Sequence, residues 1–168
     1  QASLCDIGSG AGFPSIPLKI VFPDMEMTLI DTLSKRITFL NEVIQTLNLS
    51  KITCHHARSE DLARNALFRE QFDFVTARAV ARLNVLSELC LPFVKEGGYF
   101  FALKASKAQE ELEEAQKAID LCGGTYIKTY DEPLPMTQDP RYILVIQKTH
   151  KTPKKYPRKA GIPVKKPL

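Results

Sequence analysis

The sequence predicts an α/β fold built on an open, mostly parallel sheet. Apolar segments of strand length alternate with segments of helical periodicity over most of the 168 residues, which is typical of a sheet covered by helices. Two strand-like segments at 125–130 and 141–147 have no helix between them, which predicts a closing antiparallel hairpin. A glycine-rich turn follows the first strand. The length predicts a single domain with its own core.

This turn carries the strongest functional signal in the chain. Residues 3–18 read SLCDIGSGAGFPSIPL: a strand from Ser3 to Ile7, glycines at Gly8, Gly10 and Gly12, and a helix expected from Ser15 to Val21. Glycine lets a ligand approach the backbone closely, and a helix N-terminus offers free N–H groups. In doubly wound sheets a turn of this kind lies at the ligand crevice. The alternative is a tight turn without a ligand.

The spacing of the turn distinguishes between cofactors. Dinucleotide folds use G-x-G-x-x-G, whereas this chain has Asp6-x-Gly8-x-Gly10-x-Gly12. A carboxylate at Asp6 would repel a pyrophosphate but suits the cationic groups of S-adenosylmethionine. The D-x-G-x-G-x-G pattern resembles the first motif of class I S-adenosylmethionine-dependent methyltransferases, which implies their Rossmann-like sheet.

The remaining elements are expected in alternation. Strands are predicted at 26–31, 52–56, 72–77 and 99–103, with a turn at Gly97-Gly98 before the last of these. Helices are predicted at 35–47, 82–91 and 107–121. The first of these has apolar residues at helical spacing, and the last is strongly charged, so we expect it on the outer surface.

Polar residues at the ends of these strands are candidate ligand contacts, because the carboxyl ends of parallel strands line the crevice. Asp31 could accept hydrogen bonds from a ribose, or cap the next helix. Ser59 and Glu60 could recognise adenine, or begin a short helix. Arg78 and Lys104 end the fourth and fifth strands; a surface salt bridge and a solvated lysine are the alternatives.

Positive charge is concentrated at the C-terminus. The chain has 23 basic and 19 acidic residues, a net charge of +4, yet residues 149–168 hold seven basic residues and no acid. We therefore divide the chain into a domain at 1–148 and a basic, proline-rich tail at 149–168. Its four prolines argue against a regular helix, so we expect the tail outside the core, with its charges on RNA phosphates and Tyr156 stacked on a base. The basic residues are Lys151, Lys154, Lys155, Arg158, Lys159, Lys165 and Lys166.

The remaining composition predicts a cytoplasmic protein without a metal or a membrane partner. No signal peptide or membrane-length apolar segment is visible. The four cysteines are scattered and read as buried free thiols in a reducing compartment, and the three histidines form no cluster. The cysteines are Cys5, Cys54, Cys90 and Cys122, and the histidines are His55, His56 and His150.

Six segments together resemble one family, the RsmG or GidB family of bacterial 16S ribosomal RNA guanine-N7 methyltransferases. They are DIGSGAGFPSIPL, LIDTLSKRITFLNEV, ARSEDLA, TARAVARL, ALKAS and KYPRKAGIPVKKPL, and they span essentially the whole chain. The FP after the glycines and the terminal YPRKAG are the most specific. The family has a further N-terminal helical segment, which we expect this chain to lack because its first strand begins at once.

The resemblance implies a function and a site. It implies S-adenosylmethionine as cofactor, N7 of one guanine in 16S rRNA as acceptor, and the small ribosomal subunit or its precursor as partner of a protein expected to be a monomer. Ser59 stands where the family often has alanine. Implied cofactor contacts are Gly8, Phe13, Ser59, Glu60 and Arg78, and implied basic active-centre residues are Arg58, Arg78 and Lys104.

The chemistry of the acceptor agrees with this assignment. Guanine N7 carries a lone pair and no proton, so no general base is needed. Methylation of an exocyclic amine usually uses an N-P-P-Y-type motif after the fourth strand, where this chain has A-R-A-V at 77–80. Carbon-5 methylation needs a cysteine nucleophile, and Cys54 and Cys90 are poorly placed. The basic residues are therefore assigned to RNA positioning.

Three alternatives remain at this point. A methyltransferase acting on a small molecule or another RNA would share the cofactor half of the chain, and the former would not need the basic tail. A non-catalytic ribosome-binding module would bind the cofactor weakly or not at all. A nicotinamide-dependent dehydrogenase is disfavoured by the glycine spacing.

Overall fold

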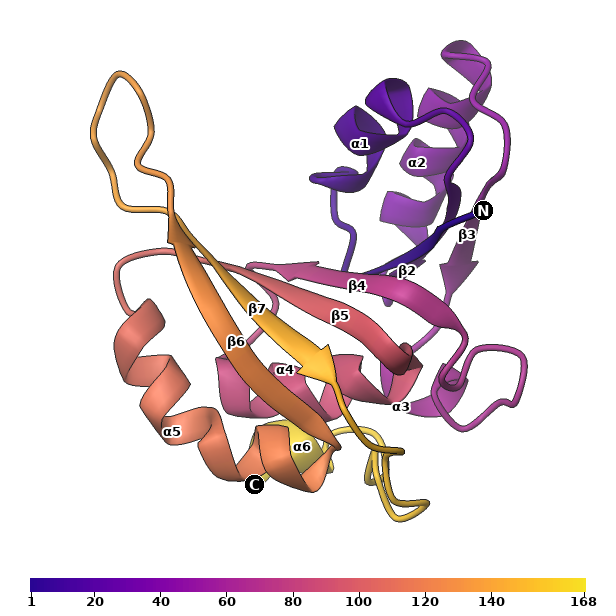
Figure 1. The fold of residues 1–168 in the computed structure, drawn as a ribbon. Coiled ribbons are helices and arrows are strands. Elements are labelled where there is room, and N and C mark those ends of the chain that lie inside the picture. Colours follow the sequence, from indigo (N-terminus) through magenta and orange to yellow (C-terminus); the bar gives the residue numbers. More distant parts are fainter.

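The computed structural model describes residues 1–168 and contains one seven-stranded sheet with the strand order β3-β2-β1-β4-β5-β7-β6 (Figure 1). The first five strands in that order are parallel, and β7 is antiparallel to both β5 and β6. The predicted fold class and the closing hairpin are therefore confirmed. The strands are β1 (Ser3–Ile7), β2 (Glu26–Asp31), β3 (Ile52–His56), β4 (Phe72–Arg78), β5 (Val94–Lys104), β6 (Gly124–Asp131) and β7 (Tyr142–Lys148).

Helices cover both faces of the sheet. Helices α1 and α2 lie on one face, and α4 and α5 lie on the other (Figure 1). Their bounds are α1 (Ser15–Val21), α2 (Ser34–Thr46), α3 (Ser59–Leu62), α4 (Leu83–Cys90), α5 (Ala108–Leu121) and α6 (Ile162–Lys165), with a 3₁₀ helix at Leu91–Phe93 after α4.

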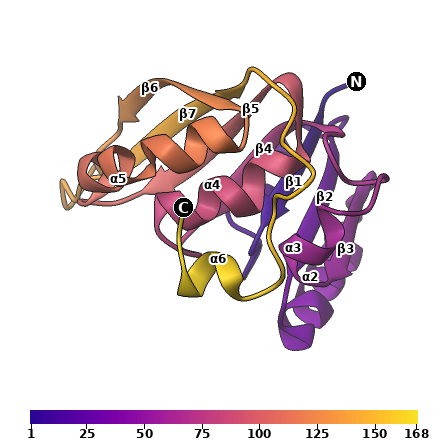
Figure 2. The same ribbon diagram turned by 90° about the horizontal axis from the view of Figure 1, so that it is seen from below.

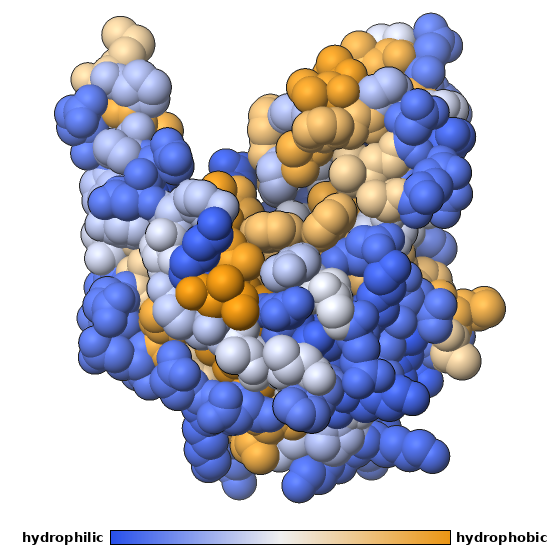
Figure 3. Space-filling model, in the orientation of Figure 1, coloured by the Kyte–Doolittle hydropathy of each residue, from blue (hydrophilic) through white to orange (hydrophobic).

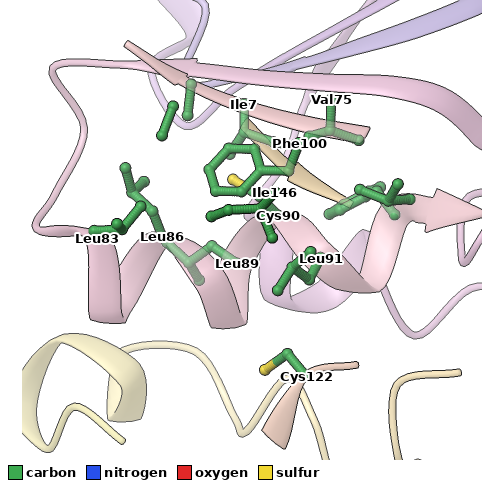
Figure 4. Packing of buried hydrophobic residues seen from close by; sticks show 14 of the residues in the cluster. Ile7, Val75, Leu83, Leu86, Leu89, Cys90, Leu91, Phe100, Cys122 and Ile146 are labelled. Atoms are coloured by element: carbon green, nitrogen blue, oxygen red, sulfur yellow. The ribbon is translucent and has the colours of Figure 1, made fainter. Parts of the chain in front are cut away.

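The larger part of the core lies between the sheet and α4. Val75 and Phe100 on the sheet point toward Leu86 and Leu91, which lie beneath them in Figure 4, and all four are fully buried. A smaller cluster under α1 and α2 includes Leu29 and Leu40. Burying one such side chain contributes about 1.5–3 kcal/mol. These clusters fix the orientation of β1, β2 and β4, whose carboxyl ends form the site.

The fifth strand is longer than predicted. It begins at Val94, so Gly97 and Gly98 lie within a strand rather than in a turn before it. The pairing register with β4 shifts between Phe72 and Phe74 at this point. A Cβ atom on Gly98 would lie 2.6 Å from the carbonyl oxygen of Asp73. The glycine pair therefore permits an irregularity in the strand.

Residues 149–168 form a folded segment, which we call the strap. Thr152, Tyr156 and Pro157 are buried, and Figure 2 shows the strap returning along the side of the molecule that carries α3 and α4 before it ends in α6. The prediction that this segment lies outside the core is wrong, and so is the expectation of an accessible Tyr156, which is 7% exposed. The prolines exclude a long helix but not an extended segment held by separate anchors.

The anchors of the strap are arginines and one buried glutamate. The Arg158 guanidinium donates to both carboxylate oxygens of Glu88 in α4, at 2.6–3.1 Å, and its backbone N–H donates to Glu88 Oε1 at 2.7 Å. Arg69 donates to the carbonyl oxygens of Thr152 and Tyr156. Glu88 is fully buried, so its charge requires this partner.

Candidate functional site

The glycine turn has the backbone conformation that only glycine adopts easily. Gly8 has a φ of +69°, and a Cβ atom there would lie 2.5 Å from Cγ2 of Val80. Gly12 has a φ of +90°, and its Cβ atom would lie 2.5 Å from Cγ1 of Ile16. The turn thus brings bare backbone against the loop after β4 and lets α1 pack closely on the sheet.

Asp31 is fixed by the same turn. Its Oδ2 accepts a hydrogen bond from the Gly10 N–H at 2.9 Å, and its Oδ1 accepts one from the Leu33 N–H at 3.0 Å. The guanidinium of Arg36 lies 3.3 Å from Oδ2. The carboxylate is 2% exposed, so it is an oriented acceptor at the end of β2 rather than a mobile surface charge.

Asp6 has a structural position. It is 1% exposed and accepts hydrogen bonds from Ser15 Oγ at 2.7 Å and Thr76 Oγ1 at 2.9 Å. Burial raises the pKa of Asp6 to about 6, and the hydroxyl hydrogen bonds partly oppose this shift. Its carboxylate joins β1 to the start of α1 and to β4, and it does not line the cavity that follows.

A cavity of about 300 Å³ opens at the carboxyl ends of β1, β2 and β3. Five of the residues proposed from the sequence line it: Gly8, Asp31, Arg58, Ser59 and Glu60. Gly10, Gly12 and Phe13, like Asp6, do not; the glycines shape the turn behind it. We call this space the first cavity, and its walls combine glycine backbone, two buried carboxylates and aliphatic side chains.

The strap supplies a wall that sequence reasoning missed. Val164 of α6 lines the first cavity, and the Gly161 N–H donates to Oε1 of Glu60 at 3.1 Å. Val80 and Leu89 also line it and were not proposed. The sequence signals of the KAGIPVKK segment are its charge and its family pattern. Nothing in local periodicity indicates that it returns to a site formed by residues 7–89.

A second cavity of about 600 Å³ adjoins the first, and Ala79 lines both. Its walls come from the ends of β4 and β5 and from the β6–β7 hairpin, including Arg78, Lys104, Glu132 and Arg141. Figure 3 shows the surface hollowed between the β6–β7 loop and the helices α1 and α2, and the second cavity is lined from the β6–β7 side and not by α1 or α2. The guanidinium of Arg78 lies 5.7 Å from the ring centroid of Phe13, which places Phe13 beside this cation.

The three predicted basic residues do not form one cluster. Arg58 precedes α3 and lines the first cavity, whereas Arg78 and Lys104 line the second. Lys104 has a side chain only 8% exposed, pairs with Glu111 at 2.6 Å and donates to the Ala81 carbonyl oxygen at 2.6 Å. Its charge is therefore balanced within the protein, while Arg78 is exposed and has no carboxylate within 4.0 Å.

The comparisons with known proteins agree with this geometry. Residues 1–131 match the family model GidB, described as rRNA small subunit methyltransferase G. The chain belongs to this family. The protein of this name from Ligilactobacillus salivarius is 56% identical over 169 residues, which cover 100% of this chain and 70% of the relative. The one from Levilactobacillus brevis is 58% identical over 99% of this chain and 69% of its own length.

Solved structures at low identity share the fold of this family member. An rRNA methylase from Streptococcus thermophilus superposes with a TM-score of 0.63 at 14% identity, covering 89% of this chain and 88% of its own. TYW2 from M. jannaschii, solved in complex with AdoMet, superposes with a TM-score of 0.68 at 16% identity, covering 87% and 68%. The sheet is thus that of class I methyltransferases. No helix of the chain has the length and apolar character needed to span a bilayer.

Proposed function

We propose that this chain transfers a methyl group from S-adenosylmethionine to N7 of a guanine in 16S ribosomal RNA. The observation that carries the proposal is the pair of cavities that meet at Ala79. One has glycine backbone and oriented carboxylates, and the other has an exposed arginine. Membership of the rRNA small subunit methyltransferase G family supports the reaction class and the type of RNA.

The first cavity fits S-adenosylmethionine. The missing side chain at Gly8 leaves room that a Cβ atom would fill against Val80. Asp31 retains a lone pair for ribose hydroxyls beside its two backbone donors and Arg36. Glu60, with one oxygen already bound to Gly161, can accept from the adenine amino group. Aliphatic side chains such as Ile30, Leu89 and Val164 provide apolar contact for a base.

The acceptor chemistry suits the residues of the second cavity. When bound, S-adenosylmethionine supplies an electrophilic methyl group. Since N7 of guanine has no proton to lose, the protein does not need a general base, and its contribution is to align the base and exclude water. Arg78 can hold O6 of guanine or a phosphate. A cation placed next to N7 would oppose the positive charge that develops on the base.

RNA reaches this site most readily as an unpaired segment, because the deep groove of an RNA helix hides N7 from side chains. We infer that the partner is 16S rRNA, within the small ribosomal subunit or its precursor, and that the protein acts in the cytoplasm as a monomer. Arg58 and Lys104 then have different roles. Arg58 approaches the rim of the first cavity, and Lys104 holds the loop after β4 through Ala81.

The test is transfer of labelled methyl from S-adenosylmethionine to under-methylated 16S rRNA, followed by mapping of N7-methylguanine. The chain should label one guanine, and Arg78→Ala should lower the rate by about 100-fold, the scale seen when a positioning contact is lost. Lys117→Ala, an exposed residue of α5 outside both cavities, is the matched control and should retain full activity. Label on another atom, or unchanged transfer in Arg78→Ala, would contradict the proposal.

A further inference from the structure

Two residues of the strap reach the first cavity from a part of the chain far from the glycine turn. The Gly161 N–H donates to Oε1 of Glu60 at 3.1 Å across 101 positions of sequence. Three residues later, Val164 lines the cavity and is 63% exposed. An exposed valine at a cavity wall offers apolar surface that a bound ligand would cover.

The strap is held firmly enough to be part of this wall. Before Gly161, Arg158 is bound to the buried Glu88, and Arg64 Nη2 donates to the carbonyl oxygen of Pro157 at 2.7 Å. Figure 2 shows α6 lying next to α4, with α3 nearby. Contacts made by the residues before α6 therefore determine its position: Arg158 binds Glu88 of α4, and Arg64, which follows α3, binds Pro157.

We propose that Gly161 and Val164 complete the adenine side of the cofactor cavity, so that docking of the strap and binding of the cofactor stabilise each other. This inference rests on the proposed function, because it assumes that an adenosine group occupies the first cavity. It adds a specificity-determining segment that lies outside the glycine turn and the strand ends.

The two residues have different tasks. The Gly161 N–H donates to Oε1 of Glu60 and so fixes the rotation of the carboxylate. Oε2 accepts a hydrogen bond from Ser59 Oγ at 3.4 Å and keeps a lone pair for an exocyclic amine. A base with a carbonyl group at that position would place one acceptor against another, because its oxygen would face Oε2, and the hydrogen bond would be lost. Val164 supplies apolar contact for the ring of the base. The oriented Glu60 carboxylate therefore favours adenine over hypoxanthine, and Val164 adds affinity for the ring.

The first experiment measures the affinity of S-adenosylhomocysteine by calorimetry for the full chain and two variants. Val164→Ala removes apolar contact in the cavity and should weaken binding by about fivefold. Ile162→Ala removes apolar bulk from the same helix outside the cavity and should leave the affinity unchanged. Equal affinities for Val164→Ala and the parent chain, or equal losses in both variants, would overturn the inference.

The second experiment tests coupling through the strap. Truncation after Ala160 keeps the Arg158–Glu88 anchor and removes both contacts. It should lower the preference for S-adenosylhomocysteine over S-inosylhomocysteine, whereas an unchanged preference would contradict the role of Gly161. In the full chain, saturating S-adenosylhomocysteine should slow tryptic cleavage after Lys159 and Lys165, and unchanged cleavage would contradict the coupling.

These measurements separate the two proposals. If the parent chain fails to bind S-adenosylhomocysteine, the proposed function fails and this inference falls with it. If the parent chain binds the ligand and transfers methyl groups while the Val164 and truncation variants behave like it, the proposed function stands. The strap is then only a structural segment.

Discussion

The three carboxylates near the site differ in their hydrogen-bond donors and in whether they face the cavity. This difference decides whether each can accept a hydrogen bond from a ligand. Asp31 and Glu60 accept backbone N–H groups and face the first cavity. Asp6 accepts two hydroxyl groups and is enclosed. The first two therefore remain acceptors for a ligand, whereas Asp6 stabilises the junction of β1, α1 and β4 at an electrostatic cost.

That cost makes Asp6 a source of unusual pH dependence. The pKa of Asp6 is raised from 3.8 to about 6 by burial, so the folded state binds its proton more tightly than the unfolded state does. The free energy of unfolding should therefore fall as pH rises from about 4 to about 6, with the full penalty above that range. Ser15 and Thr76 both donate to the carboxylate, whereas Asp6→Asn offers one acceptor and one donor, so one hydroxyl turns to accept. The variant should remove this fall in stability, a relative gain on the order of 2–3 kcal/mol.

Urea unfolding of the parent chain and Asp6→Asn between pH 4.5 and 7.5 checks this. The two curves should diverge as pH rises. Asp73 is the control of opposite sign, because hydrogen bonds from Lys95 and Ser3 outweigh burial and hold the pKa of its carboxyl below the usual value. Its contribution is present above the unfolded pKa and is lost as pH falls. Parallel curves for the parent chain and Asp6→Asn would show that Asp6 is not under this strain.

At the scale of elements, one buried ion pair joins the strap to α4. Glu88 is fully buried in α4, and Arg158 provides four of its hydrogen bonds. Arg158→Met leaves the Glu88 carboxylate buried, with only the backbone N–H of residue 158 donating to it from the strap. Because the buried charge then has no cationic partner, the free energy of unfolding should fall by about 3–5 kcal/mol. The double variant Glu88→Gln with Arg158→Met should recover much of this loss, because the uncompensated charge is gone. Denaturant unfolding of the parent chain, Arg158→Met, Glu88→Gln and the double variant measures the coupling.

Equal stability of the single and double variants would contradict the idea that an unpaired charge causes the loss. In that case the strap is held by packing of Tyr156 and by the arginines that donate to its backbone. Lys117→Met on the exposed side of α5 serves as a control for loss of a surface cation and should leave unfolding unchanged.

The same elements show which features local sequence can predict. Most strand and helix ranges were predicted closely, because each buries one face and repeats at the period of its own backbone. The glycine turn is predictable from its glycines and their spacing, which are also local features. The strap was not, since its anchors Glu88 and Arg158 are separated by 70 positions and no periodic pattern records such a pairing.

The candidate site was predictable where it depends on strand ends. Asp31, Ser59 and Glu60 line the first cavity because parallel strands end at one edge of the sheet. Lys104 also ends a strand, but its partner Glu111 comes from the first turn of α5, so its charge is paired internally. Val164 enters the site through the strap, and only the folded chain reveals it.

At the scale of the whole molecule, the strap carries two pairs of neighbouring exposed lysines, in addition to the single exposed Lys151 and Lys159. Lys165 and Lys166 follow Val164 beside the first cavity. Lys154 and Lys155 come just before Tyr156, whose carbonyl oxygen accepts a hydrogen bond from Arg69. Arg69 precedes the first residue of β4, so this lysine pair lies at the end of the parallel strands opposite to the site. All four are exposed. An RNA strand entering the site would meet the first pair and not the second.

The salt dependence of RNA binding distinguishes these pairs. Charge reversal of Lys165 and Lys166 to glutamate should weaken binding to a 16S rRNA fragment, and should reduce the slope of log K against log salt by about 1.4, the value for two phosphate contacts on a single strand. The same reversal at Lys154 and Lys155 gives an identical change in net charge and should leave the slope unchanged. The affinity for S-adenosylhomocysteine, measured in parallel, should stay constant in both variants. Equal reductions in slope in the two variants would mean that RNA responds only to overall charge. A smaller slope in the Lys165 and Lys166 variant alone would mean that RNA passes over α6 on its way to the second cavity.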